Sequence, residues 1–514
     1  MQRHLRYLGA LALVVAAAGA LSLATAQPVR ELVMAQGIDH EGWDIHDHNT
    51  TAYEAIHVNI FDYLVFKDAN GVLGPALATS WERIDDLSMR FLLREGVLWH
   101  DGEPFTAEDV KFTLERVATD SSLQEHAQYR QIREVEIVGP HEIIIHTHAP
   151  EPVLLSRLSR IGASILAKHH IEAIGGWENI SDHDPVGTGP FKVVEWRRDD
   201  RIVMEAFDDH WRGRPAWDRL IHRTIPEAST RVAELLTGGV HIATNVPPAD
   251  RARVENAGNV RIEPWPTPRV MMFIMNTEGV GTSDLRVRTA IEYAIDNQLL
   301  IDALFDGLGA PVRGRASPGI TAAPMEFYDT YLYDPERAVE LLAEAGYGPG
   351  DLTIHIQGPA GRYTLDTEIV ELTAAMLQAV GINTTLEILE WSAYQSRVWQ
   401  QPDAVQHMAL IGLGNSLADA ALTYTSVRCA PLGTYAMMSN WCDPRFDEIY
   451  AQALVEMDEA RREELFREIF TIVAEERVWV HLFQVENMVG VANTIDWQPR
   501  PDEYLWMFDA KPVN

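Results

Sequence analysis

Residues 77–117, LATSWERIDDLSMRFLLREGVLWHDGEPFTAEDVKFTLERV, contain a strand, a turn and a helix in that order. Alternate positions of the strand are apolar, as one buried face requires: Met89, Phe91 and Leu93. The turn is Asp101-Gly102, where glycine tolerates the positive φ that a tight hairpin needs. The stretch therefore predicts a half-buried strand that leads through a hairpin into a helix.

The predicted helix begins after Thr106, whose side chain can accept a hydrogen bond from the backbone N–H of Asp109. Glu108 and Asp109 place negative charge at the positive end of the helix dipole. Apolar residues then follow at helical spacing: Val110, Leu114 and Val117.

The amino-acid sequence of this stretch resembles the signature of the large peptide-binding class of periplasmic solute-binding proteins, solute-binding protein family 5. It combines Trp81, a run of acidic residues, the segment FLLREGVLWHDGEPFTAEDV and Phe112 early in the helix. This family serves ABC importers for di- and oligopeptides, nickel complexes and related solutes. The resemblance implies that Trp99, His100 and Asp101 are scaffold rather than ligand contacts.

Further blocks resemble the same family, and the resemblance spans about residues 30–495. The blocks are PVGTGPFKVVEWRRDDRIVMEAFDDHWRG at 185–213, DLRVRTAIEYAIDNQLLIDALFDGLGAPVRGRASPG at 284–319 and two amphipathic helices within 443–476. The implied fold is α/β, a two-lobed periplasmic binding protein of type II, cluster C, with an extra inserted domain. The implied parts are a first domain at 27–60, 185–270 and 487–514, an inserted domain at 61–184, and a second lobe at 271–486.

Length and net charge limit the number of domains and the classes of partner that this protein can have. The 514 residues are enough for two to four domains. The chain has 42 Lys and Arg against 75 Asp and Glu, a net charge of -33. Such acidity argues against nucleic acid as a partner, because that affinity depends on basic side chains neutralising phosphates.

The first 26 residues predict a cleaved signal peptide. A basic start precedes the apolar run from Leu8 to Leu23, and Ala24-Thr25-Ala26 has the small-x-small form of a cleavage site. Neither cysteine lies at this site, so we expect a periplasmic protein without a lipid anchor. The two cysteines, Cys429 and Cys442, favour a disulfide in an oxidising compartment. A metal site is the alternative, although two thiolates alone rarely complete one.

The loop EGWDIHDHNTT at 41–51 has two interpretations. The resemblance implies that it lies near the cleft between the lobes, with Trp43 and His46 as ligand contacts. A metal site is the alternative, for which alternation would place three ligands on one side: Asp44, His46 and His48.

Gly361-Arg362-Tyr363 follows a predicted strand at Leu352–Ile356 and precedes a predicted helix at Glu368–Val380. Open α/β sheets present ligands at the carboxyl ends of their strands, so Arg362 and Tyr363 are candidate ligand residues. In dipeptide-binding relatives an Arg near this position serves the peptide carboxylate. A surface ion pair is the alternative for Arg362.

A second candidate region is LIGLGNSLADAALTYT at 410–425, which begins as a strand. Peptide-binding relatives have aromatic and acidic residues here, and one Asp pairs with the ammonium group of the ligand. This chain has Asn415 and Ser416 instead, with Asp419 as the nearest acidic residue. Trp391 can stack on a ligand or belong to the core.

These observations predict a solute-binding protein of an ABC importer that holds a peptide-like solute through Asp419 and Arg362. Its expected partners are the solute and the permease with its ATPase, and we expect a monomer without a cofactor. Nickel- or metal-chelate binding is the alternative within the class. A periplasmic hydrolase is the alternative from another class, but the chain has no Gly-x-Ser-x-Gly, and the five-residue step from His141 to His146 does not fit a zinc protease.

Overall fold

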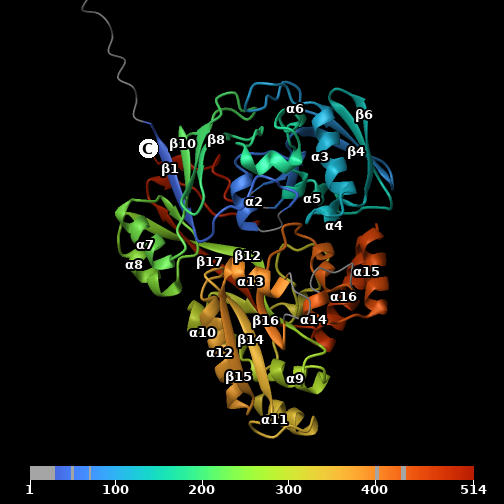
Figure 1. The fold of residues 1–514 in the computed structure, drawn as a ribbon, viewed down its shortest axis with the longest axis vertical. Coiled ribbons are helices and arrows are strands. Elements are labelled where there is room, and N and C mark those ends of the chain that lie inside the picture. Colours follow the sequence, from blue (N-terminus) through green and yellow to red (C-terminus); the bar gives the residue numbers. More distant parts are fainter. Residues whose placement is uncertain (1–28, 48–50, 69–70, 400–404, 430–435, 514) are drawn as a thin grey trace, which may run out of the picture.

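The computed structural model describes residues 29–47, 51–68, 71–399, 405–429 and 436–513 (Figure 1). The predicted signal peptide, residues 1–26, and His48 lie outside the described residues. Within those ranges no helix has both the length and the apolar character needed to span a membrane.

The opening stretch folds as predicted, into β4 (Ala78–Asp85), β5 (Ser88–Leu93) and α3 (Ala107–Thr119). Gly102 has a φ of 92° and its N–H donates to the Trp99 carbonyl over 2.9 Å. The Asp109 carboxylate accepts the Thr106 N–H over 2.9 Å at the start of α3. The alternating apolar side chains of β5 are buried with those of α3 in one core.

A four-stranded antiparallel sheet carries this core, in the order β4-β5-β7-β6, with β6 at Ile132–Gly139 and β7 at Glu142–Thr147. Helix α3 lies against this sheet in the upper body of the molecule (Figure 1). This core draws its residues from the segment between Leu64 and Trp211.

A larger sheet of eleven strands runs through the rest of the molecule, with its path in the order β15-β14-β16-β12-β17-β11-β1-β10-β9-β8 and β13 paired to β17. Its strands are β1 (Glu31–Gln36), β8 (Phe191–Arg197), β9 (Arg201–Ala206), β10 (Arg219–Thr224), β11 (Ile242–Ala243), β12 (Val260–Met275), β13 (Gly309–Pro311), β14 (Thr353–Ala360), β15 (Asn383–Glu390), β16 (Met408–Leu413) and β17 (Trp479–Ala492). Two short strand pairs lie apart from it: β2 (Val65–Lys67) with β3 (Leu73–Pro75), and β18 (Ile495–Asp496) with β19 (Lys511–Pro512).

Helices cover both parts of this sheet (Figure 1). Their bounds are α2 (Thr51–His57), α4 (His126–Tyr129), α5 (Leu154–Arg157), α6 (Lys168–Ala173), α7 (Ala228–Thr237), α8 (Arg251–Glu255), α9 (Leu285–Ala294), α10 (Asn297–Phe305), α11 (Pro335–Glu344), α12 (Asp366–Ala379), α13 (Trp391–Tyr394), α14 (Ala436–Ser439), α15 (Pro444–Val455) and α16 (Glu459–Glu476). Strands β14 and β15 are parallel and α12 connects them, so the predicted α/β lobe is confirmed.

The antiparallel strands β12 and β17 connect two parts of the molecule (Figure 1). The upper body contains β1 and the four-stranded sheet, and the lower lobe contains β14, β15 and α12. Their register shifts between Pro266 and Val270, where proline removes ladder donors. In the lower lobe, a disulfide joins Cys429 and Cys442, as the cysteine content favoured.

Candidate functional site

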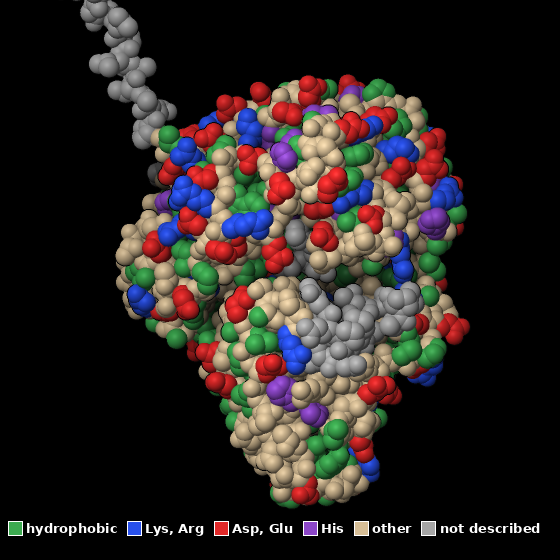
Figure 2. Space-filling view, viewed as in Figure 1, with side chains coloured by type: hydrophobic (Ala, Val, Ile, Leu, Met, Phe, Trp, Pro, Cys, Tyr) green, Lys and Arg blue, Asp and Glu red, His purple; other side chains and the backbone are tan. Residues whose placement is uncertain are grey.

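A cavity of about 70 Å³, partly open to solvent, lies where the upper body meets the lower lobe. Figure 2 shows the hollow between these two parts, with acidic side chains spread over the surface around it. The lining comes from β1 and the loop after it, α2, the segment after β11, α10, the β14–α12 turn, the C-terminal segment after β18, and the crossover strands β12 and β17. The lining residues are Gln36, Gly37, Ile38, Thr51, Ala55, Thr244, Asn245, Trp265, Arg269, Met271, Phe305, Gly361, Arg362, Tyr363, Thr364, Val485, Asn487, Glu503 and Leu505.

Arg362 and Tyr363 reach this cavity from the turn between β14 and α12, where the sequence placed them. The turn is held by Asp366, whose carboxylate accepts the N–H groups of Gly361, Arg362 and Tyr363 at 3.2, 2.9 and 3.0 Å. An Asp in the first turn of a helix is well placed for this role. Helix α12 therefore fixes the backbone from which Arg362 projects.

The Arg362 guanidinium lies among aromatic rings. It is 4.9 Å from the ring centroid of Tyr363 and 5.3 Å from that of Trp391. Trp391 meets Tyr363 edge to face behind the cavity wall, so three of the predicted ligand residues come together. The Arg362 Nε has no hydrogen-bond partner, and its guanidinium forms no ion pair with any described residue. Burial, with the like charge of Arg269, lowers the pKa of Arg362.

The floor of the cavity contains an ion pair that sequence analysis did not find. Arg269 donates from Nε and Nη2 to the two carboxylate oxygens of Glu503 at 3.1 and 2.5 Å. Its Nη1 also donates to the Gly412 carbonyl over 2.7 Å, and its Nη2 to the Thr51 hydroxyl over 3.4 Å. In the sequence, the sign of a buried charge here was Arg269, the charged residue within the apolar segment PRVMMFIMN.

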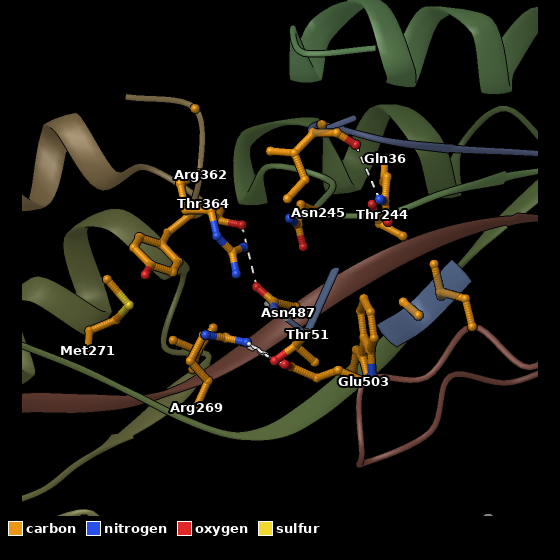
Figure 3. A pocket seen from close by; sticks show the side chains of 18 of the residues that line it. Gln36, Thr51, Thr244, Asn245, Arg269, Met271, Arg362, Thr364, Asn487 and Glu503 are labelled. Atoms are coloured by element: carbon orange, nitrogen blue, oxygen red, sulfur yellow. Dashed lines mark hydrogen bonds and ion pairs between the residues drawn. The ribbon is translucent and has the colours of Figure 1, made fainter. Parts of the chain in front are cut away.

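Amide side chains form the rest of the polar lining. Figure 3 shows Arg362, Asn245 and Asn487 turned toward one another, while Arg269 lies against Thr51 and Glu503. Asn487 accepts a hydrogen bond from the Thr364 hydroxyl over 3.4 Å. Among the described residues, the lining thus offers neutral donors and acceptors beside a single unpaired cation.

Asp419 does not line this cavity. It is 3% exposed, and both its oxygens bind the Arg462 guanidinium, with Nη1 at 2.9 Å from Oδ2. The same carboxylate accepts the Ala421 N–H over 2.8 Å. Asn415 donates to the Asp419 carbonyl over 2.9 Å, and the Ser416 hydroxyl accepts from the Arg160 Nε over 2.8 Å. These contacts tie the 415–419 loop to its surroundings.

Trp43 and His46 also lie away from the cavity, in the interior of the upper body. Trp43 is 1% exposed and its ring centroid is 4.2 Å from that of His40. His46 is fully buried and lies 2.9 Å from the Arg116 Nη1 through its Nδ1, while Arg116 also binds Asp44 at 2.7 and 2.6 Å. Burial lowers the pKa of His46 to about 3.

The described parts of the chain contain no group of three or more His, Cys, Asp or Glu side chains arranged to hold a metal ion. Two of the three residues of the metal alternative, Asp44 and His46, instead bind Arg116.

Comparisons with known proteins identify the family and the relatives that this chain is similar to. A family model for "Bacterial extracellular solute-binding proteins, family 5 Middle" matches residues 72–428. The chain is 28% identical over 445 residues to the dipeptide-binding protein of Escherichia coli K12, covering 81% of this chain and 82% of that protein. It is 29% identical over 500 residues to the glutathione-binding protein GsiB of Escherichia coli O1:K1 / APEC, covering 95% of each.

Solved structures agree in fold. The dipeptide-binding protein of Pseudoalteromonas sp. SM9913 with Met-Leu superposes with a TM-score of 0.85 at 23% identity, covering 94% of this chain and 100% of that one. NikA of Staphylococcus aureus with Ni(L-His)2 gives 0.81 at 18% identity, with the same coverage. The predicted two-lobed binding-protein fold is confirmed. Because the family model matches more than half of its length, the chain belongs to the family 5 bacterial extracellular solute-binding proteins, which bind solutes for ABC importers and are not enzymes.

Proposed function

We propose that this chain captures a small peptide-like solute that carries a carboxylate, and that the Arg362 guanidinium binds this group. The observation that supports the proposal is that Arg362 lines the cavity between the lobes and forms no ion pair with the described residues. An Arg guanidinium binds a carboxylate with two parallel hydrogen bonds, which is the geometry that favours Arg at such sites.

The charge balance of the cavity supports an anionic group on the solute. The charged lining side chains are Arg269, Arg362 and Glu503, and the first and last of these neutralise each other. One positive charge, that of the half-buried Arg362, therefore stays uncompensated by the lining. A solute carboxylate would offset the cost of burying that charge.

The remaining lining suits the rest of a peptide-like solute. Gln36, Asn245 and Asn487 offer the amide groups that pair with peptide N–H and C=O groups, while Tyr363 and Phe305 offer aromatic surface. The relatives from Escherichia coli are named for a dipeptide and for glutathione, and both ligands carry free carboxylates. The sequence-based hypothesis is that Asp419 binds the cationic end of the solute. Because Arg462 already forms an ion pair with that carboxylate, the variant Asp419→Asn tests this hypothesis separately.

The same proposal includes transport. The chain would be exported by its signal peptide, act as a monomer in the periplasm, close its lobes about β12 and β17, and deliver the solute to a permease with its ATPase. Residues 61–184 would be the inserted domain. Hinge closure around a ligand is a common motion of such two-lobed proteins.

Metal-chelate binding is the weaker alternative, because Asp44 and His46 are engaged by Arg116. Addition of nickel should therefore leave the binding of a peptide-like solute unchanged.

The test begins with native mass spectrometry of protein purified from the periplasm, which identifies any solute that remains bound. Titration calorimetry then compares glutathione and Met-Leu with their carboxyl-amidated forms. Loss of one charged hydrogen-bonded partner should weaken binding by about tenfold to a hundredfold, both in Arg362→Gln and in the amidated solutes. Arg337→Gln is the control, because Arg337 is exposed and pairs with Glu344 on the lower lobe. Equal affinity for acid and amide forms would refute the assignment of Arg362.

A further inference from the structure

A second cavity, of about 390 Å³ and also partly open to solvent, lies on the other face of the crossover strands. Side chains alternate faces along a strand, and β17 follows this rule here. Val485 and Asn487 line the first cavity, whereas Gln484 and Glu486 line the second. The two cavities share no lining residue, so the second is a separate space.

Both parts of the molecule contribute to its walls, and most of the lining is apolar or uncharged. The lining residues are Lys67, Gly71, Pro266, Thr267, Pro268, Gly309, Pro318, Gly319, Ile320, Tyr328, Asn415, Ser416, Ala418, Gln484, Glu486, Pro501 and Asp502. Prolines, Ile320 and the Tyr328 ring supply rigid apolar surface. Such a lining with a few charged groups is typical of small-molecule sites.

Two of the three charged side chains in this cavity already have partners. The Lys67 Nζ donates to the carbonyls of Ser416 and Leu417 at 2.7 and 3.1 Å. Asp502 accepts from the Arg500 Nε and Nη2 at 3.0 and 2.6 Å.

Glu486 is different, because its carboxylate has no hydrogen bond or ion pair with any part of the chain that the structure describes. Arg251, whose charge interacts with that of Glu486, forms an ion pair with Glu255 instead, over 3.0 Å. Glu486 is only partly exposed. Burial raises the pKa of Tyr328, and the charges of Asp329 and Glu486 add to this shift, so the phenol and the carboxylate lie within electrostatic reach of each other.

We propose that this second cavity binds a small organic cation with an apolar or aromatic body. Glu486 binds the ammonium or guanidinium group, which the Tyr328 ring can also approach with its face. The prolines and Ile320 contact the body. Glu486 is the acidic group of this cavity without a partner among the described residues, whereas in the first cavity the charged group without an ion pair is the Arg362 guanidinium.

The probe is 2-phenylethylammonium, compared with the uncharged 2-phenylethanol and the anionic 3-phenylpropionate, in titration calorimetry with the whole exported chain. We expect saturable binding of the ammonium with a preference of about tenfold or more over the alcohol. Glu486→Gln should abolish that preference, and Glu486→Lys should transfer it to the phenylpropionate. A general loss of folding cannot produce such a reversal. The thermal midpoint of wild-type protein should also rise with the ammonium, since a ligand that binds only the folded state stabilises it.

Two control variants distinguish binding in the second cavity from nonspecific attraction and from binding in the first cavity. Glu344→Gln removes one exposed carboxylate of the lower lobe and should leave ammonium binding unchanged, which excludes general attraction to an acidic surface. Arg362→Gln should also leave it unchanged, so the test is independent of the proposed solute site. Absence of saturable ammonium binding, equal affinity for ammonium and alcohol, or unaltered preference in Glu486→Gln would each overturn the proposal.

Discussion

Replacement of Asp419 by Asn separates a structural role for this carboxylate from a role in ligand binding. Asp419 and Arg462 have side chains 5% and 6% exposed and are joined by two hydrogen bonds. Asn keeps the size of the side chain and can still accept the Ala421 N–H. It removes the negative charge, so the buried Arg462 charge is left uncompensated.

The expected cost follows from this geometry. Removing one partner of a buried ion pair typically lowers the free energy of unfolding by about 3 to 5 kcal/mol. Asn retains one neutral hydrogen bond to Arg462, so we expect about 3 kcal/mol for Asp419→Asn. Arg462→Met should cost a similar amount. The double variant should cost less than the sum of the two, because neither residue then leaves a buried charge unpaired.

The assay is urea unfolding followed by tryptophan fluorescence and circular dichroism, with stability taken from the midpoint at an unchanged slope. Glu326→Gln is the matched control, because the Glu326–Arg467 pair is about half exposed and should contribute less than about 1 kcal/mol. Solute affinity is measured on the folded protein in parallel. If Asp419→Asn costs less than about 1 kcal/mol but weakens solute binding tenfold or more, the structural reasoning is refuted and Asp419 acts on the solute.

Three further predictions follow from other parts of the molecule. Reduction of the Cys429–Cys442 disulfide should lower the free energy of unfolding by about 3 kcal/mol, through loop closure over a separation of 13 residues, and an unchanged urea midpoint in reductant would contradict this. Burial raises the pKa of Glu54 from 4.5 to about 7. The folded chain therefore keeps a proton that the unfolded chain releases, so this stabilisation is complete below about pH 4.5 and is lost as the pH rises to about 7. Glu54→Gln should remove roughly 3 kcal/mol of that pH dependence, whereas a stability difference from wild type that is constant between pH 5 and 8 would argue against it. Trp43→Ala should cost about 3 to 5 kcal/mol because the ring is buried, with solute affinity of the folded fraction retained; a selective loss of affinity would instead make Trp43 a ligand contact.

Several local features could be predicted from the sequence because each depends on residues that are close along the chain. The β5 strand, the turn at Gly102 and helix α3 follow from side-chain periodicity and from the conformational freedom of glycine. The position of Arg362 at the carboxyl end of β14 follows from the order of strand, turn and helix. The family resemblance also depends on short sequence motifs, and the match to the family model confirms it.

The partners of the buried charges could not be predicted in this way. Arg269 and Glu503 are 234 positions apart in the chain, and Asp419 and Arg462 are 43 apart. Which carboxylate meets which guanidinium depends on how the lobes and crossover strands pack. An acidic residue near a family motif can therefore be a candidate ligand group in the sequence and half of a buried ion pair in the fold.

By itself, then, the sequence determined local strands, turns and helices and the family, and through the family resemblance the two-lobed α/β architecture, because these signals lie in short stretches of neighbouring residues. Only the tertiary structure decided that Arg362 and Glu486 stay unpaired among the described residues and that they face different cavities. The physical reason is that burial removes water from charged groups wherever the chain brings them together. Whether a protein group or a solute then compensates each charge depends on contacts between segments that are distant in sequence.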